Sequence, residues 1–433
     1  MTYTIVLHGQ KFEQDFLSSW IKYNRLKQEI SQDALAHGIC STSHLSYFEN
    51  GKKPLRPEII EALLNKLQLD ISQHPEHFKH LRHTFHKFLT RIEGFEFIQA
   101  HERYEEIVSL SEHIQHSPYE IEYQVHTLAY KIMVCHELYH DLEDEVIFLD
   151  KLYTTFPDAL KFTYLLTTGK LIYDHHSRKS GLDRLRDAYQ LRQTAWIEYR
   201  LGVAYTYDNN PLKGIEHLER ALNAYESTGR YYNALSCHTF LARCHTALEN
   251  FDTARYHCIT ILDGSELFSM NKNIWGVFNQ MAQIDIQSGR YEESLKWSAQ
   301  AIQQSSVDST SNTDPWRQAS WRIHDERLIG VMYQIEAYLA LGQLPKCKEL
   351  LALHLVDDNK NERYYLMLMY YNLLIYHFQE DLFYTEMTDV ILPYYTQIGY
   401  LNLARILNLK LAEYLESKRR YKEANQIYKT MIK

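Results

Sequence analysis

The stretch from Ile30 to Gly51, ISQDALAHGICSTSHLSYFENG, decides how the first part of this chain folds. Ser31 is placed to cap a short helix, because its hydroxyl can accept a hydrogen bond from a free N–H group of the first turn. Gly38 permits a tight turn, and Ser41 is placed to cap a second helix in the same way. Two short capped helices joined by such a turn are typical of a helix-turn-helix, whose second helix reads the major groove of DNA.

The second helix is expected to have an inner and an outer face. Leu45 and Phe48 are three residues apart and share a face, which we expect to pack against Leu35 and Ile39. The outer face carries small polar side chains that can approach base edges, while Gln32 and the lysines that follow can contact phosphates. The predicted DNA-binding residues are Gln32, Ser41, Thr42, Ser43, His44, Ser46, Tyr47, Asn50, Lys52 and Lys53.

Two amphipathic helices are predicted on either side of this motif. The apolar positions that indicate them are Phe16, Trp20, Tyr23 and Leu26 before it, and Ile59, Ile60, Leu63, Leu64 and Leu67 after it. Pro57 suits the first turn of the later helix. Residues 1–70 therefore predict a complete small helical domain. The plainer alternative is a compact helical hairpin without a role in DNA binding.

Several of these residues also carry a family resemblance: Gln32, Leu35, Ala36, Ile39, Cys40, Ser43, Leu45, Ser46, Glu49 and Gly51. At these positions the chain resembles the DNA-binding domain of the peptide-pheromone regulators of Gram-positive bacteria, the RRNPP class that contains PlcR and NprR. The Ile39-Cys40 pair and the Glu49-Asn50-Gly51 end are most similar to NprR. The resemblance covers residues 1–70 at the level of the motif and the rest in architecture alone. Such helices commonly carry a cation where this chain has Tyr47-Phe48, which implies a different operator.

The distribution of charge limits how this domain can bind DNA. The chain has 433 residues and a formal net charge of -9, whereas residues 1–70 hold eight Lys or Arg and eight Asp or Glu. A neutral domain attracts DNA weakly, so we expect binding to depend on a homodimer and on cations such as Lys52 and Lys53. The sequence shows no Gly-rich phosphate loop, nucleophile elbow or kinase signature, and we expect no cofactor.

The expected location is the cytoplasm. The first ten residues, MTYTIVLHGQ, lack the basic start and apolar core of a signal peptide. The longest uncharged apolar run, Tyr364 to Tyr376, is shorter than the roughly 20 residues that a membrane span requires. The six cysteines have no framework spacing, as expected for reduced thiols.

From residue 121 onward, small residues recur at a period of roughly forty, which predicts tetratricopeptide-like helix pairs. Gly202 and Ala221 mark one such unit, Ala242 and Ala254 the next, and eight units are proposed in all. Residues 71–120 are expected to form a helical linker and an irregular first repeat, with breaks at Pro75 and Pro118. Residues 303–315 are expected to form a surface loop. The expected fold class is all-α: a helix-turn-helix domain followed by a tetratricopeptide-like solenoid over residues 121–433.

The concave face of such a solenoid is lined by the first helix of each pair and suits a peptide ligand. Side-chain amides such as those of Asn279 and Gln283 can hydrogen-bond a peptide backbone, and Arg243 or Lys170 can bind its carboxylates. The predicted peptide-binding residues are Lys170, Tyr173, Tyr199, Thr239, Arg243, Asn279, Gln283, Glu336, Tyr370 and His377. For any one of them, an ordinary polar surface position is the simpler interpretation.

Two motifs suggest metal sites instead. His136-Glu137-Leu138-Tyr139-His140 matches H-E-x-x-H, in which a helix presents two histidines to zinc and a glutamate acts as base. No third ligand is evident, and the repeat pattern continues through the motif. The other motif combines Cys237-His238, Cys244-His245 and His257-Cys258, whose cysteines occupy positions where the repeat needs small packing residues. We therefore expect no metal at either motif.

We expect a transcription regulator rather than an enzyme, controlled by a short signalling peptide in quorum sensing. Its expected partners are an operator in double-stranded DNA, the oligopeptide and a second copy of the chain. The resemblance to NprR-like and Rap-like proteins also implies a response-regulator protein as a partner. The alternatives are a helix-turn-helix protein fused to a zinc metallopeptidase, and a repeat protein that acts mainly by binding a response regulator.

Overall fold

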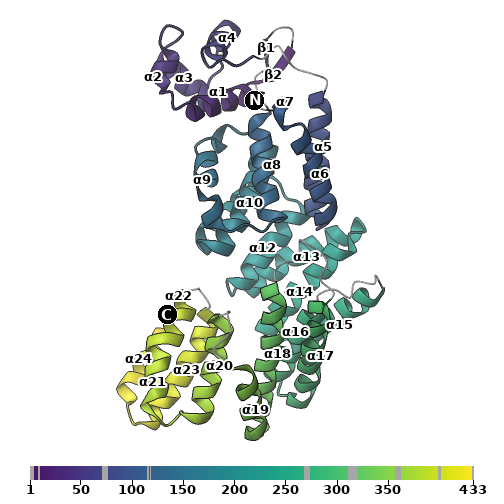
Figure 1. The fold of residues 1–433 in the computed structure, drawn as a ribbon, viewed down its shortest axis with the longest axis vertical. Helices are drawn as coiled ribbons and strands as arrows, with labels where there is room; N and C mark the ends of the chain where they lie inside the picture. The colour runs from purple at the N-terminus through teal and green to yellow at the C-terminus, as the bar shows by residue number, and fades with distance from the viewer. Residues whose placement is uncertain are drawn as a thin grey trace. The chain divides into compact units, whose positions relative to one another are not determined.

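The structure, a computed structural model, describes residues 4–7, 10–70, 77–114, 117, 119–267, 274–310, 320–355, 362–397 and 401–431. The chain divides into two compact units. The first comprises Met1–Tyr207 with Lys213–Cys237, and the second comprises Asp208–Leu212 with His238–Lys433. Both are built almost entirely from helices (Figure 1), so the predicted helical fold class is confirmed.

The first unit begins with a small domain around the quoted stretch. Its elements are β1 (Thr4–Leu7), β2 (Gln10–Glu13), α1 (Gln14–Lys27), α2 (Gln32–Ala36), α3 (Thr42–Glu49) and α4 (Pro57–Lys66). The four helices match the predicted ones. The antiparallel strands, with Leu7 opposite Gln10, were not predicted. Ile5 and Leu7 are buried while Val6 between them is exposed, the alternation of a strand with one face on a core.

The predicted inner face of the motif forms the core of this domain. Leu35, Leu45 and Phe48 are completely buried, together with Trp20 of α1 and Leu63 of α4. Helices α1 and α4 therefore close the apolar side of the helix-turn-helix and leave the opposite side of α3 to solvent.

The remaining helices of the first unit pack as successive antiparallel pairs. They are α5 (His77–Glu93), α6 (Phe97–Ser109), α7 (Ser111–Ile114), α8 (Glu120–Met133), α9 (Tyr139–Asp150), the short η1 (Tyr153–Thr155), α10 (Asp158–His175), α11 (Arg178–Leu191), α12 (Ala195–Tyr207) and α13 (Pro211–Ser227). Helix α14 (Tyr231–Ala247) runs from the first unit into the second. Residues 77–114 are helical except for turns at 94–96 and 110, whereas Pro75 and Pro118 lie outside the described residues.

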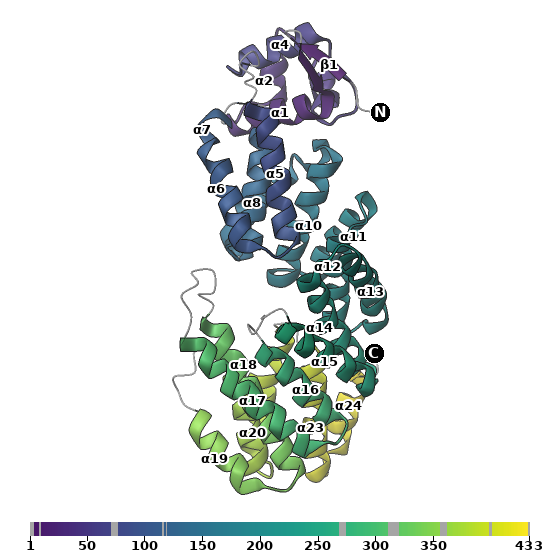
Figure 2. The ribbon, with the colours of Figure 1, turned by 90° about the vertical axis from the view of Figure 1, so that its right-hand side faces the viewer.

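The second unit continues the helix pairs. Its further elements are α15 (Phe251–Leu267), α16 (Ile274–Gln287), α17 (Tyr291–Thr310), α18 (Ser320–Ala340), α19 (Leu344–His354), α20 (Glu362–Tyr376), α21 (Asp381–Glu386), the π-helical η3 (Met387–Ile391), α22 (Leu392–Gln397), α23 (Leu401–Ser417) and α24 (Tyr421–Met431). Helices α16, α17 and α18 lie side by side in both views (Figure 2).

Small residues allow the close packing within these pairs. A Cβ on Gly202 of α12 would lie 2.5 Å from Leu218 Cγ of α13, and one on Gly181 of α11 would overlap the backbone of Tyr173 of α10. Ala221 and Ala242, which carried the repeat pattern, are completely buried. The predicted tetratricopeptide-like packing is thus confirmed at the contacts that require small residues.

One predicted loop is wrong in part. Residues 303–310 continue helix α17, and Ser305 within them is buried with its hydroxyl donating to Ile302 O at 2.9 Å. Residues 311–315 lie outside the described residues. Among the helices that the structure describes, none is long and apolar enough to cross a membrane.

Candidate functional site

The candidate recognition helix is α3. Ser41 Oγ accepts a hydrogen bond from His44 N at 3.3 Å, and Ser31 Oγ accepts one from Ala34 N at 3.1 Å, so both predicted caps are confirmed. Ser43, His44 and Tyr47 are exposed on the side opposite the buried Leu45 and Phe48. Helix α3 thus presents a polar surface with an aromatic side chain that is 49% exposed.

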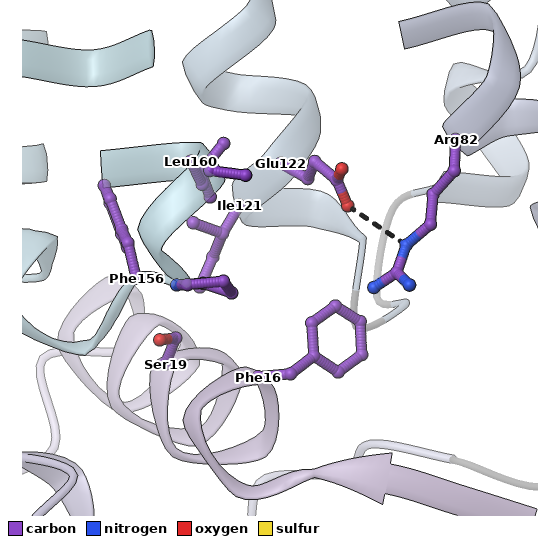
Figure 3. Close-up of a pocket in the computed structure, with 9 residues that line it drawn as sticks. Phe16, Ser19, Arg82, Ile121, Glu122, Phe156 and Leu160 are labelled. Atoms are coloured by element: carbon purple, nitrogen blue, oxygen red, sulfur yellow. Dashed lines mark ion pairs between the residues drawn. The ribbon is translucent and has the colours of Figure 1, made fainter. Parts of the chain in front are cut away.

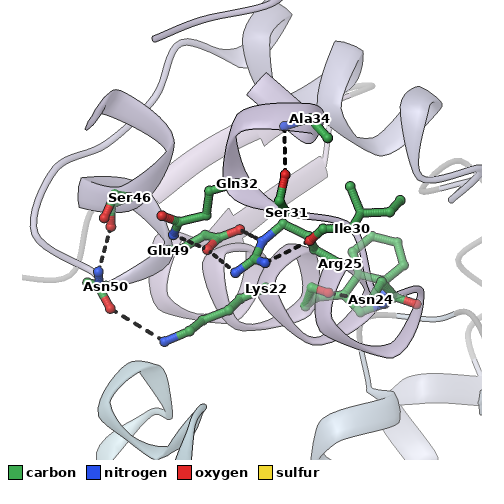
Figure 4. A network of polar contacts seen from close by, with 11 residues as sticks. Lys22, Asn24, Arg25, Ile30, Ser31, Gln32, Ala34, Ser46, Glu49 and Asn50 are labelled. Atoms are coloured by element: carbon green, nitrogen blue, oxygen red, sulfur yellow. Dashed lines mark hydrogen bonds and ion pairs between the residues drawn. The ribbon is translucent and has the colours of Figure 1, made fainter. Parts of the chain in front are cut away.

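Helix α3 is fixed to its neighbours by a buried charge network (Figure 4). Arg25 of α1 forms two hydrogen bonds with Glu49, and its Nη1 donates to Ile30 O at 2.9 Å in the connection to α2. Gln32 Nε2 donates to Glu49 Oε2 at 2.7 Å. The network holds α1, α2 and α3 in one arrangement.

This network employs one residue that the sequence assigned to DNA. The amide N–H of Gln32 that was expected to reach a phosphate lies on Glu49 instead. Asn50 is held from both sides, with its Nδ2 donating to Ser46 O at 2.8 Å and its Oδ1 accepting from Lys22 Nζ at 3.4 Å. In the structure, Gln32 and Asn50 therefore make contacts that hold α3 against its neighbours.

The other predicted DNA-contacting side chains differ in whether they bind another residue of the chain. Thr42 Oγ1 donates to Asp33 Oδ1 at 3.0 Å, which places a carboxylate beside the first turn of α3. Lys52 and Lys53 are exposed after the helix, and neither has an ion pair within the described part of the chain. These two lysines are the cations nearest in sequence to the reading surface.

The predicted peptide-binding residues lie on the first helices of successive pairs. Lys170 and Tyr173 are on α10, Tyr199 on α12, Thr239 and Arg243 on α14, Asn279 and Gln283 on α16, Glu336 on α18 and Tyr370 on α20, with His377 directly after α20. Nine of the ten predicted residues therefore lie on helices, and their role in peptide binding stays a prediction.

Three of these residues are buried tyrosines. Tyr173 donates to Ala204 O at 2.8 Å, Tyr199 packs its ring 5.4 Å from that of Phe95, and Tyr370 belongs to the core of the second unit. Burial raises the pKa of both Tyr199 and Tyr370. These side chains contribute to packing between helices in the structure.

Other predicted residues have partners nearby on the chain. Lys170 forms an ion pair with Asp174 at 3.0 Å, and His377 Nδ1 lies 2.8 Å from Glu380 Oε2. Glu336 accepts a hydrogen bond from Tyr371, and burial raises the pKa of its carboxyl group. A ligand would have to compete with these contacts.

The amides on α16 lie close to two other helices. Asn279 is buried with its Oδ1 against Gly330 of α18, where an added Cβ would come within 3.3 Å. The neighbouring Gln280 donates from Nε2 to Thr239 O of α14 at 3.3 Å. Gln283, one turn further, is partly exposed. This part of α16 therefore combines buried amides with one that solvent or a ligand can reach.

Sequence reasoning missed Arg200, which follows Tyr199 on α12. Its guanidinium carbon lies 5.6 Å from the centre of the Tyr199 ring, and its Nε is buried without a hydrogen-bond partner. The hydroxyl of Tyr225 on α13 is likewise buried without a partner. Unsatisfied buried polar atoms are uncommon in folded proteins, so Arg200 and Tyr225 are candidate contacts for a bound water or a ligand group among the described residues. No pattern in the sequence singles out Arg200, because its contacts depend on how α12 packs.

The two zinc motifs do not have the geometry that zinc would need. Residues 136–138 lie in the connection between α8 and α9, and His136 has a φ of 57°. His136 and His140 therefore do not share the face of one helix. In the part of the chain that the structure describes, no group of three or more His, Cys, Asp or Glu side chains is arranged to hold a metal ion.

The cysteines of the second motif are buried packing residues. Cys237, Cys244 and Cys258 are completely buried, and burial raises the pKa of the Cys258 thiol to about 12. The histidines beside them meet, with His238 Nδ1 2.8 Å from His257 Nδ1. Burial and the two neighbouring histidines lower the pKa of His257 to about 4.

Comparisons with known proteins agree with both parts of the fold. Residues 21–73 match the helix-turn-helix family model. The chain is 23% identical over 415 residues to the transcriptional activator NprA of Geobacillus stearothermophilus, covering 91% of this chain and 97% of the relative.

Solved structures show the same fold. The apo form of the quorum sensor NprR from B. thuringiensis is 19% identical with a TM-score of 0.61, covering 82% of this chain and 98% of that one. NprR in complex with its cognate peptide NprX is 20% identical with a TM-score of 0.61, covering 81% and 98%. The resemblance read from the quoted stretch is thus confirmed: a helix-turn-helix precedes helical repeats with the fold of the quorum sensor NprR.

Proposed function

We propose that this chain is a DNA-binding transcription regulator controlled by a short signalling peptide that binds its helical repeats. The observation that carries the proposal is the exposed polar face of α3, a helix that Ser41 caps and the Arg25–Glu49 pair holds to α1. The chain is also similar along nearly all its length to a transcriptional activator.

On the DNA side, α3 enters the major groove with Ser43, His44 and Tyr47 toward the bases. Lys52 and Lys53 contact phosphates on the flank of the groove. Residues 1–70 have a balanced charge and would bind a single half-site weakly. The regulator therefore acts as a homodimer, in which two linked half-sites multiply a modest affinity.

On the peptide side, the ligand lies along the first helices of the repeats. Arg200 binds a carboxylate of the peptide, since its guanidinium has hydrogen bonds to offer and lies over an aromatic ring. Within the second unit, taken by itself, Gln283 and Asn279 offer amide groups of the kind that bind a peptide backbone, and Arg243 offers a guanidinium group for an acidic side chain. The fold shared with NprR, which was solved in complex with its cognate peptide NprX, supports a peptide as the class of ligand.

The setting of this function is quorum sensing in the cytoplasm, by analogy with the quorum sensor NprR. We assign the DNA-binding part to residues 1–70, the link to 71–120 and the sensor to 121–433. The resemblance to NprR-like and Rap-like proteins implies a response-regulator protein as a second partner of the repeats.

The test uses the full chain, a labelled DNA fragment from the promoter of the gene it controls, and synthetic peptides of five to ten residues encoded next to its own gene. We expect one such peptide to change operator affinity at least tenfold, which corresponds to about 1.4 kcal/mol of coupling. Arg200→Ala should abolish the effect of the peptide while operator binding without peptide stays unchanged.

The matched control is Arg186→Ala, because Arg186 lies one helix earlier and pairs with Asp183 at the surface. It should respond to the peptide as the wild type does. Sequence-specific DNA binding that no peptide alters would contradict the sensor, and absence of specific DNA binding would contradict the regulator.

The peptidase alternative makes a different prediction. A zinc peptidase would retain about one metal ion per chain, and Glu137→Gln would abolish its proteolysis. We expect the purified chain to show neither property, because His136 lies outside the helix that carries His140.

A further inference from the structure

A pocket of about 350 Å³ lies within the first unit, where α1 of the DNA-binding domain meets the first repeats (Figure 3). Most of its lining is apolar, including Phe16 of α1, Ile121 of α8, Phe156 after η1 and Leu160 of α10. Ile121, Phe156 and Leu160 are buried in the fold, so the pocket is part of the packed joint.

One wall of the pocket carries an arginine and a glutamate of opposite charge. Arg82 Nε lies 3.8 Å from Glu122 Oε2, which is too long for a hydrogen bond. The Arg82 guanidinium is steadied by two rings, at 5.7 Å from the centre of Phe16 and 5.4 Å from that of Tyr119. No hydrogen bond reaches either charged group from the residues that the structure describes.

Both charged groups can therefore accept further partners. The Glu122 side chain is only 22% exposed, and burial raises the pKa of its carboxyl group against the opposing effect of Arg82. A cation placed on Glu122 would replace the water that burial has removed. Arg82 is 54% exposed and can turn its N–H groups toward an anion without disturbing the core.

We propose that this pocket binds a free α-amino acid with an apolar side chain. Its ammonium group pairs with Glu122, its carboxylate with Arg82, and its side chain fills the space between Phe16, Ile121 and Leu160. An α-amino acid carries an ammonium group and a carboxylate group on the same α carbon. This arrangement suits the carboxylate of Glu122 and the guanidinium of Arg82, which lie side by side.

Other ligand classes fit less well. An apolar acid without an amine would bring a second anion to Glu122, and an apolar amine without an acid would bring a second cation to Arg82. A pocket of about 350 Å³ is at the small end of ligand sites, which span roughly 300–1,000 Å³, and has no room for an oligopeptide. The site is therefore distinct from the proposed peptide site.

Such a ligand would contact α1 and the repeats at once. Helix α1 already meets the repeats through Ser19, whose Oγ donates to Thr155 O at 2.7 Å, and through Tyr23 and Lys27, which both donate to Glu120. An amino acid in the pocket would add a further link at this joint and stabilise it by binding the folded state.

The experiment measures the thermal unfolding midpoint and the heat of binding of the full chain with L-leucine and L-phenylalanine. The comparison ligands are 3-methylbutylamine and 4-methylpentanoate, which are leucine without its carboxylate and leucine without its amine. We expect a midpoint that rises with the concentration of at least one amino acid and at least tenfold weaker binding of the amine and the acid.

Two variants place the binding at this pocket. Arg82→Gln should weaken binding of the amino acid at least tenfold, and Ala159→Trp should block the rim of the pocket, where Ala159 is exposed. Arg91→Gln, which removes another half-exposed arginine from α5, is the control and should bind as the wild type does. The proposal would be overturned if neither amino acid gave a heat of binding, if the amine bound as tightly as the amino acid, or if the Arg82→Gln variant bound the amino acid as the wild type does. None of these outcomes bears on DNA or peptide binding.

Discussion

Arg25 forms two parallel hydrogen bonds with Glu49, from Nε to Oε1 at 2.6 Å and from Nη2 to Oε2 at 2.8 Å. Glu49 is the last residue of α3, and its side chain is completely buried. The pair fixes the end of the candidate recognition helix to α1. Since α1 is also bonded to Glu120 of the repeats through Tyr23 and Lys27, a short chain of contacts leads from the reading helix to the repeats.

The first prediction concerns the stability of this network. Glu49→Ala leaves the Arg25 guanidinium buried without its anion and removes the acceptor of Gln32, so it should lower the free energy of unfolding by about 3–5 kcal/mol. Denaturant unfolding followed by circular dichroism measures the loss. Glu58→Ala on the exposed start of α4 is the control and should change stability by less than about 0.5 kcal/mol. Equal stability of the two variants would contradict the structural role of the pair.

The local features of the DNA-binding domain could be predicted, because they depend on residues three or four apart. The caps at Ser31 and Ser41 and the inward turn of Leu45 follow from helix geometry alone. The Arg25–Glu49 pair joins residues 24 positions apart, for which the sequence carries no periodic signal.

The same contrast explains the errors elsewhere. Residues 303–310 have a loop-like composition, but Ser305 is buried in the packing of α17, and tertiary contacts outweigh local propensity there. H-E-x-x-H requires an unbroken helix, and the sequence did not reveal the turn at His136. Arg200 stands out only once its neighbours are known, because an unsatisfied donor is a property of the packed structure.

The second prediction concerns the close packing of the repeats. Gly202→Ala places a methyl group against the Leu218 side chain and should destabilise the chain by about 1–3 kcal/mol. Gly276→Ala in α16 is the matched control, since a Cβ there meets nothing within 4 Å. Gly276→Ala should raise the free energy of unfolding by no more than about 1 kcal/mol, because alanine favours a helix over glycine. Urea unfolding followed by circular dichroism distinguishes the two, and equal effects would argue against the helix contact at Gly202.

The third prediction concerns acid. The pKa of His257 is lowered from 6.5 to about 4 by burial and by His238 and His245, so the unfolded chain takes up a proton in this range that the folded chain does not. The resulting stability is complete above pH 6.5 and is lost as the pH falls toward 4, at up to about 1.4 kcal/mol per pH unit.

His257→Gln should therefore flatten the dependence of unfolding free energy on pH between 4 and 6.5. His126, whose pKa burial also lowers to about 4, should maintain a remaining slope. His140→Gln is the control, because His140 is 73% exposed at the surface, and it should keep the slope of the wild type. A slope that His257→Gln leaves intact would show that His257 is protonated in the folded state.

The last prediction separates base contacts from phosphate contacts at α3. Lys52 is exposed beside the reading helix, so Lys52→Ala should weaken binding to operator and to random DNA by the same factor. It should also reduce the slope of log affinity against log salt by about 1 per subunit, because the phosphate that no longer contacts a lysine keeps its bound counterion. Ser43 lies on the exposed face of α3, and Ser43→Ala should cost about 1–3 kcal/mol on the operator alone with the salt slope unchanged. Lys429→Ala removes the same charge from α24 and should change neither quantity. Fluorescence anisotropy over a salt series measures all three variants, and a loss for Ser43→Ala that is equal on random DNA would move the reading surface away from α3.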